Sequence, residues 1–120
     1  MSRRDIDVSV LDGIAPFDRF RKRALRLLAP HVDRLRLRQG TVLVNENQTA
    51  REFILVIEGE VIERRGGVEI GRFGPGTRIG DAAVVHHASH VSTFVAASDL
   101  ELLVVNGPAY RWAAQHGTVG

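Results

Sequence analysis

The sequence predicts a mainly β fold, an antiparallel jelly-roll β-barrel (double-stranded β-helix) with a helix before it and a short helix after it. Short runs of strand-forming residues, separated by glycine and proline turns, fill the middle of the chain, and segments with a helical period lie at both ends. A length of 120 residues allows one packed core. We expect a lead-in at residues 1–15, the domain at 16–116, and a tail at 117–120.

The two terminal segments have the period of α-helices. Apolar residues recur at steps of three and four from Pro16 until Pro30 ends the pattern. These residues are Phe17, Phe20, Ala24, Leu27 and Leu28. At the other end, Gly107-Pro108 opens a short helix predicted at 109–116, because proline suits the first turn of a helix.

The region between these helices is predicted to be strands and turns. A period of two puts Leu35 and Leu37 on one face of a strand and the neighbouring arginines on the other. The expected strands cover residues 34–38, 41–44, 52–58, 61–65, 68–73, 92–97 and 100–105. The 52–58 run is apolar on both faces, which predicts a strand inside the sandwich. Gly66-Gly67 predicts a two-residue hairpin turn.

Composition restricts the classes of function. No apolar run approaches the roughly 20 residues that span a bilayer, and no apolar stretch of a secretory signal follows Met1, so we expect a cytoplasmic protein without a membrane segment. The absence of cysteine excludes disulfides and thiolate chemistry. A net charge of only +2, with no helix-turn-helix after the predicted barrel, predicts no DNA-binding motif.

Basic residues crowd the segment from Arg19 to Arg38, where the acids are Asp33 and the preceding Asp18. Such a segment could be a patch for nucleic acid, anionic lipid or an acidic partner. It could also be the solvated face of a helix followed by that of a strand, and both periodicities favour this second interpretation. No aromatic residues interleave with the basic ones, which argues against binding of single-stranded nucleic acid.

The most informative stretch is IGDAAVVHHASHVSTFVAA, residues 79–97. Small residues at Gly80, Ala82 and Ala83, directly after a strand, let the backbone approach a ligand closely. A short helix at this point would direct its free N–H groups outward. The stretch therefore predicts a cradle for an anion.

The spacing of several features resembles that of the cyclic nucleotide-binding domain family. The features are Gly40, the run VIEGEV at 56–61, the run FGPGTRIGDAA at 73–83, and the run HVSTFVA at 90–96. In that family a strand ends in Gly-Glu-x-Ala, and the cassette closes with Arg-x-Ala-Thr or a similar run. Asp81 and His90 stand nine residues apart, which suits the family's spacing of acid and arginine. The resemblance covers about residues 17–116.

The resemblance implies a non-catalytic regulatory domain that senses cyclic AMP or cyclic GMP and needs no other cofactor. Asp81 would face the ribose hydroxyl, His90 would face the cyclic phosphate, and backbone N–H groups would supply the remaining contacts. The implied ligand-binding residues are Gly80, Asp81, Ala82, Ala83, His90, Val91, Ser92 and Thr93. Output would pass through a protein partner or through self-association.

Three departures from the family pattern imply reduced affinity. Asp81 is one methylene shorter than glutamate, and His90 lacks the forked, permanently charged donors of arginine. The printed sequence also ends four residues after His116, so we expect no lid helix over the base. Loss of the arginine alone would weaken binding by about 10- to 100-fold. If His90 charges when it meets a phosphate, affinity should rise as pH falls from about 8 to 6.

Two other functions are compatible with the sequence. The barrel could have lost its ligand and serve as an interaction or structural module. A cupin-like metalloenzyme could use His86, His87 and His90, but residues 40–60 contain no histidine to complete such a site. The acids on the predicted strands, including Glu63, are expected on polar outer faces, so no catalytic pair is predicted.

The aromatic residues of the predicted helices have two possible roles. Trp112, on the final helix, is the candidate for covering an exposed base. Phe17 and Phe20 could likewise either stack on a ligand or pack in the core. Packing against the barrel end is the commoner role for all three.

Overall fold

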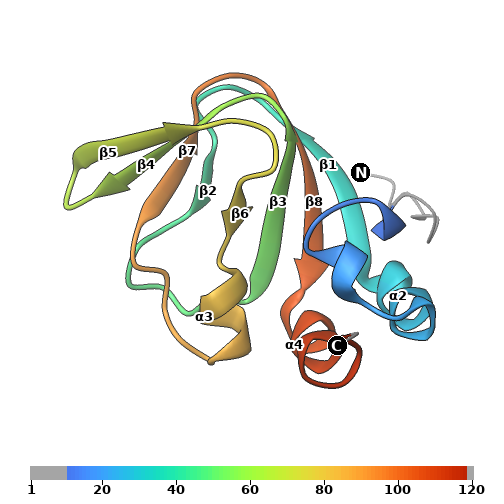
Figure 1. The fold of residues 1–120 in the computed structure, drawn as a ribbon. Helices are drawn as coiled ribbons and strands as arrows, with labels where there is room; N and C mark the ends of the chain where they lie inside the picture. The colour runs from blue at the N-terminus through green and yellow to red at the C-terminus, as the bar shows by residue number, and fades with distance from the viewer. Residues whose placement is uncertain (1–10, 119–120) are drawn as a thin grey trace.

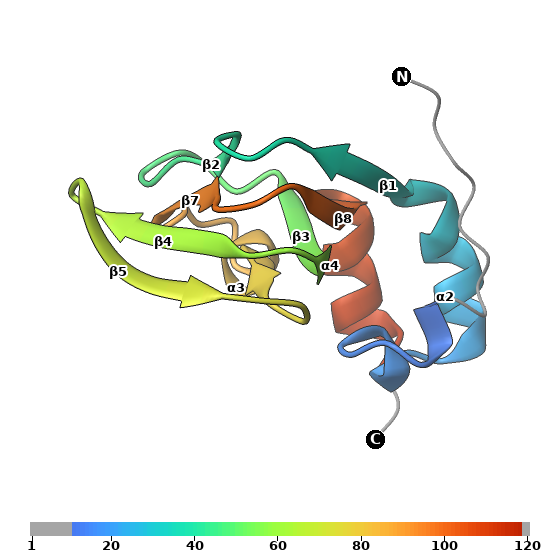
Figure 2. The ribbon, with the colours of Figure 1, turned by 90° about the horizontal axis from the view of Figure 1, so that it is seen from above.

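The computed structural model describes residues 11–118 and contains two four-stranded sheets that face each other (Figures 1 and 2). One sheet has the order β1 (Val32–Leu37), β8 (Leu100–Asn106), β3 (Glu52–Glu58) and β6 (Arg78–Ile79). The other has the order β2 (Val42–Val44), β7 (Thr93–Ala96), β4 (Val61–Arg65) and β5 (Val68–Phe73). Every pairing is antiparallel, so the predicted mainly β, jelly-roll-like fold is confirmed, although the sheets do not close into one barrel.

Short helices lie at the ends of the chain and in the cassette. The first part of the chain forms η1 (Phe17–Arg19), α2 (Lys22–Leu28) and η2 (Ala29–His31). The cassette forms α3 (Asp81–Val85), and the chain closes with α4 (Gly107–His116). None of the described helices has the length and apolar character needed to cross a membrane.

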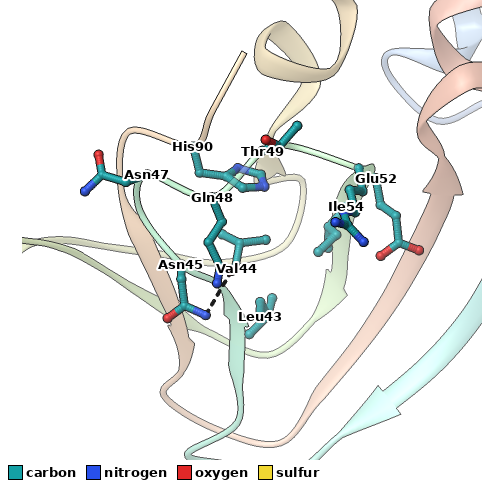
Figure 3. A pocket seen from close by; sticks show the side chains of 10 residues that line it. Leu43, Val44, Asn45, Asn47, Gln48, Thr49, Glu52, Ile54 and His90 are labelled. Atoms are coloured by element: carbon teal, nitrogen blue, oxygen red, sulfur yellow. Dashed lines mark hydrogen bonds between the residues drawn. The ribbon is translucent and has the colours of Figure 1, made fainter. Parts of the chain in front are cut away.

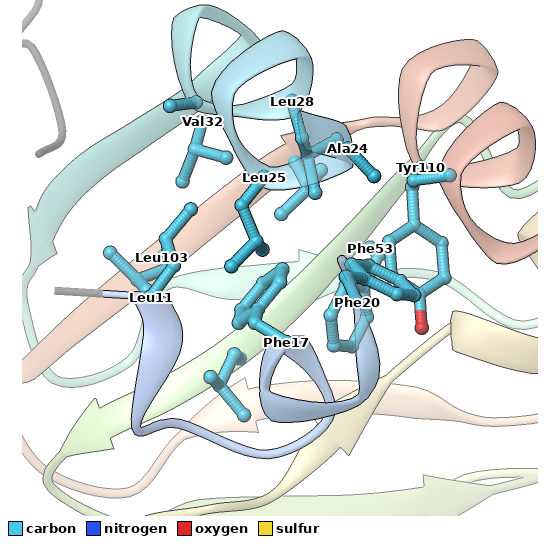
Figure 4. Packing of buried hydrophobic residues seen from close by; sticks show 14 of the residues in the cluster. Leu11, Phe17, Phe20, Ala24, Leu25, Leu28, Val32, Phe53, Leu103 and Tyr110 are labelled. Carbon is cyan, nitrogen blue, oxygen red and sulfur yellow. The ribbon is translucent and has the colours of Figure 1, made fainter. Parts of the chain in front are cut away.

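The core consists of two apolar clusters. One lies between the facing sheets and includes Val56, Val61 and Leu102. The other packs the helices against β3 and β8, as Figure 4 shows, and contains Phe17 and Phe20 as the packing alternative predicted. In this cluster the ring of Phe53 on β3 lies 4.5 Å from the ring of Tyr110 on α4. Helix α4 is thereby fixed to the sheet that carries the cassette.

The single helix predicted from Pro16 is interrupted at Phe20, which is extended with φ −90° and ψ 144°. Phe20 forms an isolated β-bridge with Thr118, and the Arg21 amide donates to the Gly117 carbonyl oxygen at 2.7 Å. Contact with the far end of the chain therefore overrides the local helical period. Helix α2 begins only at Lys22.

This later start changes which leucine is buried. Leu25 is fully buried in the core, whereas Leu27, expected on the apolar face, is 53% exposed. The described core also includes Leu11, which is fully buried, and Gly117 packs against α2. The rest of the lead-in, residues 1–10, and the tail residues 119–120 lie outside the described residues.

Most strand bounds agree with the sequence prediction. The strands predicted at 52–58, 61–65 and 68–73 are β3, β4 and β5 without a change of limits. Gly66 and Gly67 both have positive φ angles, of 59° and 80°, as a two-residue hairpin turn of this twist requires. The turn therefore sets the register of the first pairs of the β4–β5 hairpin, Arg65 with Val68 and Arg64 with Glu69.

Candidate functional site

The predicted cradle is built around Gly80, which caps the N-terminus of α3. Gly80 has φ 82°, and a Cβ atom there would lie 2.7 Å from Cε1 of His90. The Val84 amide donates to the Gly80 carbonyl oxygen at 2.8 Å, which closes the first turn. Both the backbone angle and the close approach of His90 therefore require glycine at this position.

The first three amides of α3 remain available to a ligand. No described residue accepts a hydrogen bond from the N–H groups of Asp81, Ala82 or Ala83. The first N–H groups of a helix have no partner within the helix, and they carry a partial positive charge. The cassette thus keeps the backbone donors that the sequence predicts for an anion site.

These residues border a cavity of about 400 Å³, here called the cassette cavity. Its walls come from the chain between Arg78 and Ser92, from Glu63 on β4, and from Phe94 on β7. Seven of the eight residues that the resemblance implies line it, namely Gly80, Asp81, Ala82, Ala83, His90, Val91 and Ser92. Thr93 does not line the cavity, because its hydroxyl bonds instead with the Glu46 amide at 3.0 Å.

His90 is a buried residue in the wall of this cavity. It is 9% exposed, and its backbone is held by the Gln48 carbonyl oxygen at 2.9 Å and the Asn47 amide at 2.8 Å. Desolvation by burial lowers the pKa of the His90 imidazole below its usual value of 6.5, so the ring is neutral at pH 7. Unlike an arginine, it brings no positive charge to the free cavity.

The same histidine borders a second cavity of about 590 Å³ (Figure 3). This cavity lies beside the loop between β2 and β3, and polar residues such as Asn45, Gln48 and Glu52 line it together with Ile54. His90 therefore lines both cavities.

Glu63 also lines the cassette cavity, although the sequence placed it on a polar outer face. Ser92, which is 1% exposed, donates from Oγ to Glu63 Oε2 at 2.6 Å. Arg65 donates from Nε and Nη2 to the same Ser92 hydroxyl, at 3.3 and 3.1 Å. The alternation of residues along β4 could have indicated this position, because Glu63 follows the buried Val61 by two residues and shares its face.

The charges of the cassette cavity do not favour an anion. The carboxylates of Glu63 and Asp81 each lie near one guanidinium: Arg65 Nη2 is 3.8 Å from Glu63 Oε2, and Arg78 Nη1 is 4.0 Å from Asp81 Oδ2. With His90 neutral, negative groups outnumber positive ones among these lining residues. Backbone N–H groups are thus the main attraction for a phosphate.

Helix α3 packs directly against α4. The Nε of Arg111 on α4 donates to the Val84 carbonyl oxygen at 2.8 Å, and a Cβ on Gly107 would lie 3.6 Å from Val84 Cγ1. This hydrogen bond and the packing of Gly107 hold α3 and α4 together. Trp112 lies on α4 but neither lines the cassette cavity nor belongs to the core, so neither predicted role fits it.

The three histidines of the cassette do not form a metal site. Across residues 11–118, no group of three or more histidine, aspartate or glutamate side chains is arranged to hold a metal ion. His87 adopts φ 53° at the turn after α3, which interrupts the helical face that His86 and His90 would have to share.

Known proteins of similar structure have the same fold. The sensor domain of the transcriptional regulator DNR from Pseudomonas aeruginosa superposes with a TM-score of 0.81 at 19% identity, covering 93% of this chain and 83% of that one. A cyclic nucleotide-binding-like protein from Brucella abortus gives 0.73 at 27% identity, covering 92% and 98%. The regulatory domain of Toxoplasma gondii PKA, crystallised with cAMP, gives 0.76 at 18% identity, covering 88% and 42%.

Sequence comparison agrees with the structural one. The chain is 25% identical over 81 residues to the cGMP-dependent protein kinase egl-4 of Caenorhabditis briggsae, which covers 68% of this chain and only 11% of the kinase. It thus spans a small part of that relative. A model of the cyclic nucleotide-binding domain matches residues 34–116, which include the whole cassette. The chain therefore belongs to the cyclic nucleotide-binding domain family.

Proposed function

We propose that this chain is a non-catalytic regulatory domain that binds cyclic AMP or cyclic GMP in the cassette cavity, with reduced affinity. The observation that carries the proposal is the set of unbonded amides of Asp81, Ala82 and Ala83 at the border of a 400 Å³ cavity. That space suits a small ligand, and the amides suit its phosphate. Asp81 is the acceptor for a ribose hydroxyl.

The reduced affinity follows from His90 and from the acids of the cavity. A cyclic phosphate beside a neutral, buried imidazole gains little until the ring takes up a proton. Glu63 and Asp81 add repulsion that their partners Arg65 and Arg78, at 3.8 and 4.0 Å, offset only in part. Binding then depends on the backbone donors, and we expect a dissociation constant about 10- to 100-fold above that of the same cassette with arginine at position 90.

A second candidate function is that of a ligand-free interaction module. The observation that favours it is the Glu63 carboxylate, held by the Ser92 hydroxyl at 2.6 Å and directed to the cavity. In this case the cavity stays empty of nucleotide, and the domain acts through its surface on a protein partner or on a second copy.

Titration of the ¹⁵N-labelled chain with each nucleotide, followed by NMR, tests the proposal. Saturable shifts of the Asp81, Ala82 and Ala83 amides support nucleotide binding, and the comparison of the two titrations identifies the preferred base. The double variant Asp81→Glu, His90→Arg should bind more tightly. If neither the natural chain nor this variant shows shifts in the cassette at millimolar nucleotide, the proposal is wrong and the interaction module remains.

A further inference from the structure

A groove between α2 and α4 lies apart from the cassette cavity. The two helices are side by side at the end of the molecule opposite the β4–β5 hairpin (Figure 2). Their ends meet where a Cβ on Gly117 would lie 2.4 Å from the Ala24 Cβ. Beside this contact is a depression of about 280 Å³, here called the α2–α4 groove, lined by Arg21, Arg23, Leu27, Trp112 and His116.

Two large apolar side chains of this groove are exposed to solvent. Leu27 is 53% exposed and Trp112 is 43% exposed, and they come from different helices. The indole of Trp112 lies 5.9 Å from the His116 ring, so it rests along α4 and is not inserted into the core. Exposed apolar side chains that gather in a depression mark interaction sites, and tryptophan is among the residues enriched at the centre of protein interfaces.

The charges around the groove all have one sign. The segments Lys22–His31 and Gly107–His116, which form α2, η2 and α4, contain no aspartate and no glutamate. The ionisable groups that line the groove are Arg21, Arg23 and His116. A partner that covers Leu27 and Trp112 must therefore bring acidic groups to the rim, because a basic partner would meet like charges.

We propose that the α2–α4 groove docks an acidic amphipathic helix of a partner protein. Leucine-type side chains at steps of three and four would cover Leu27 and Trp112, and flanking glutamates would pair with Arg21 and Arg23. The groove favours a helix over a membrane, since its apolar side chains line a depression between two helices and do not project from a convex ridge. Nucleic acid would use the arginines but leave both apolar side chains uncovered.

The test uses the intrinsic fluorescence of Trp112, because the chain contains one tryptophan. The probes are two synthetic amphipathic helices of about 18 residues with the same leucine face, one with glutamates on its polar face and one with lysines. The glutamate helix should shift the Trp112 emission to the blue with saturation, at least about tenfold more tightly than the lysine helix. Nucleotide is left out, so the outcome is independent of cassette binding.

Variants locate the binding to the groove. Arg23→Glu should weaken binding of the glutamate helix at least about tenfold, whereas Arg64→Glu, at an exposed position on β4, makes the same charge change away from the groove and should not. The proposal is wrong if the two variants bind equally, if neither helix binds, or if both helices bind alike. It is also wrong if only phosphatidylserine vesicles, or only self-association of the chain, shift the Trp112 emission.

Discussion

Cε1 of His90 lies 2.7 Å from the position that a Cβ atom on Gly80 would occupy, so the histidine ring and the glycine backbone of the cassette are in direct contact. Gly80 also sets the first turn of α3, whose amides border the cavity. The shape of the anion cradle therefore depends on both residues together.

Gly80→Ala should destabilise the domain by about 1–3 kcal/mol, because alanine is strained at φ 82° and its methyl group meets the His90 ring. Urea unfolding followed by circular dichroism measures the difference. Gly74→Ala is the matched control, since a Cβ there has no atom within 4 Å and the φ of Gly74 is not positive. Equal midpoints for the two variants would contradict the proposed contact.

The loss of folding stability at acid pH should depend on His90. Burial lowers the pKa of His90, so the folded state favours the neutral ring. Its contribution is present above the ordinary value of about 6.5 and is lost as pH falls through the lowered folded-state pKa. Urea unfolding between pH 8 and 5 should show a steeper loss of stability for the natural chain than for His90→Gln. Parallel profiles for the two proteins would show that His90 is not desolvated.

Nucleotide affinity should also depend on the ionisation of His90. A bound phosphate raises the pKa of His90 above its value in the free cavity, so binding takes up a proton. Affinity should therefore increase as pH falls from about 8 to 6, while His90→Arg should be tighter at pH 8 and nearly independent of pH. Calorimetry at the two pH values measures this, and a dependence that persists in His90→Arg would assign the proton to another group.

Local sequence patterns predicted the bounds of the strands better than they predicted the surroundings of individual side chains. β3, β4 and β5 are bounded by Gly59 and by the glycine turns, so alternation and turn chemistry fix them without knowledge of distant contacts. The break at Phe20 depends on Thr118, about one hundred residues along the chain, and no local period encodes it. Within the cassette, small residues and spacing located the cavity, because they act through the backbone.

The polar neighbours of the cassette required tertiary information. Thr93 turns to Glu46 across the β2–β3 loop, and Arg65 reaches Ser92 from β4. Which residues of β4 and β5 face each other also depends on a bulge between Glu63 and Arg64, which shifts the register. Sequence alternation alone assigns such residues to a face but does not identify their partners.

The ionisation of Tyr110 should report on the packing of α4 against the cassette. Burial is the main cause that raises the pKa of this phenol to about 12, and the nearby Asp81 charge adds to it. The chain contains one tyrosine, so absorbance at alkaline pH follows it alone. Asp81→Asn should lower the midpoint slightly. The contribution of Tyr110 to stability is present below pH 10 and is lost as pH rises through about 12. A midpoint near 10 in the folded protein would contradict the buried position.

Glu63→Gln should strengthen nucleotide binding by about three- to tenfold, because it removes one of the two carboxylates in the cassette cavity and keeps an oxygen to accept the bond from Ser92. Calorimetric titration with cyclic AMP and cyclic GMP measures the gain. Glu58→Gln, an equal change of charge at an exposed position outside the cavity, is the control and should leave the affinity unchanged. If both variants gain equally, the effect comes from the net charge of the protein. If Glu63→Gln gains nothing, the Glu63 carboxylate is not what limits nucleotide binding.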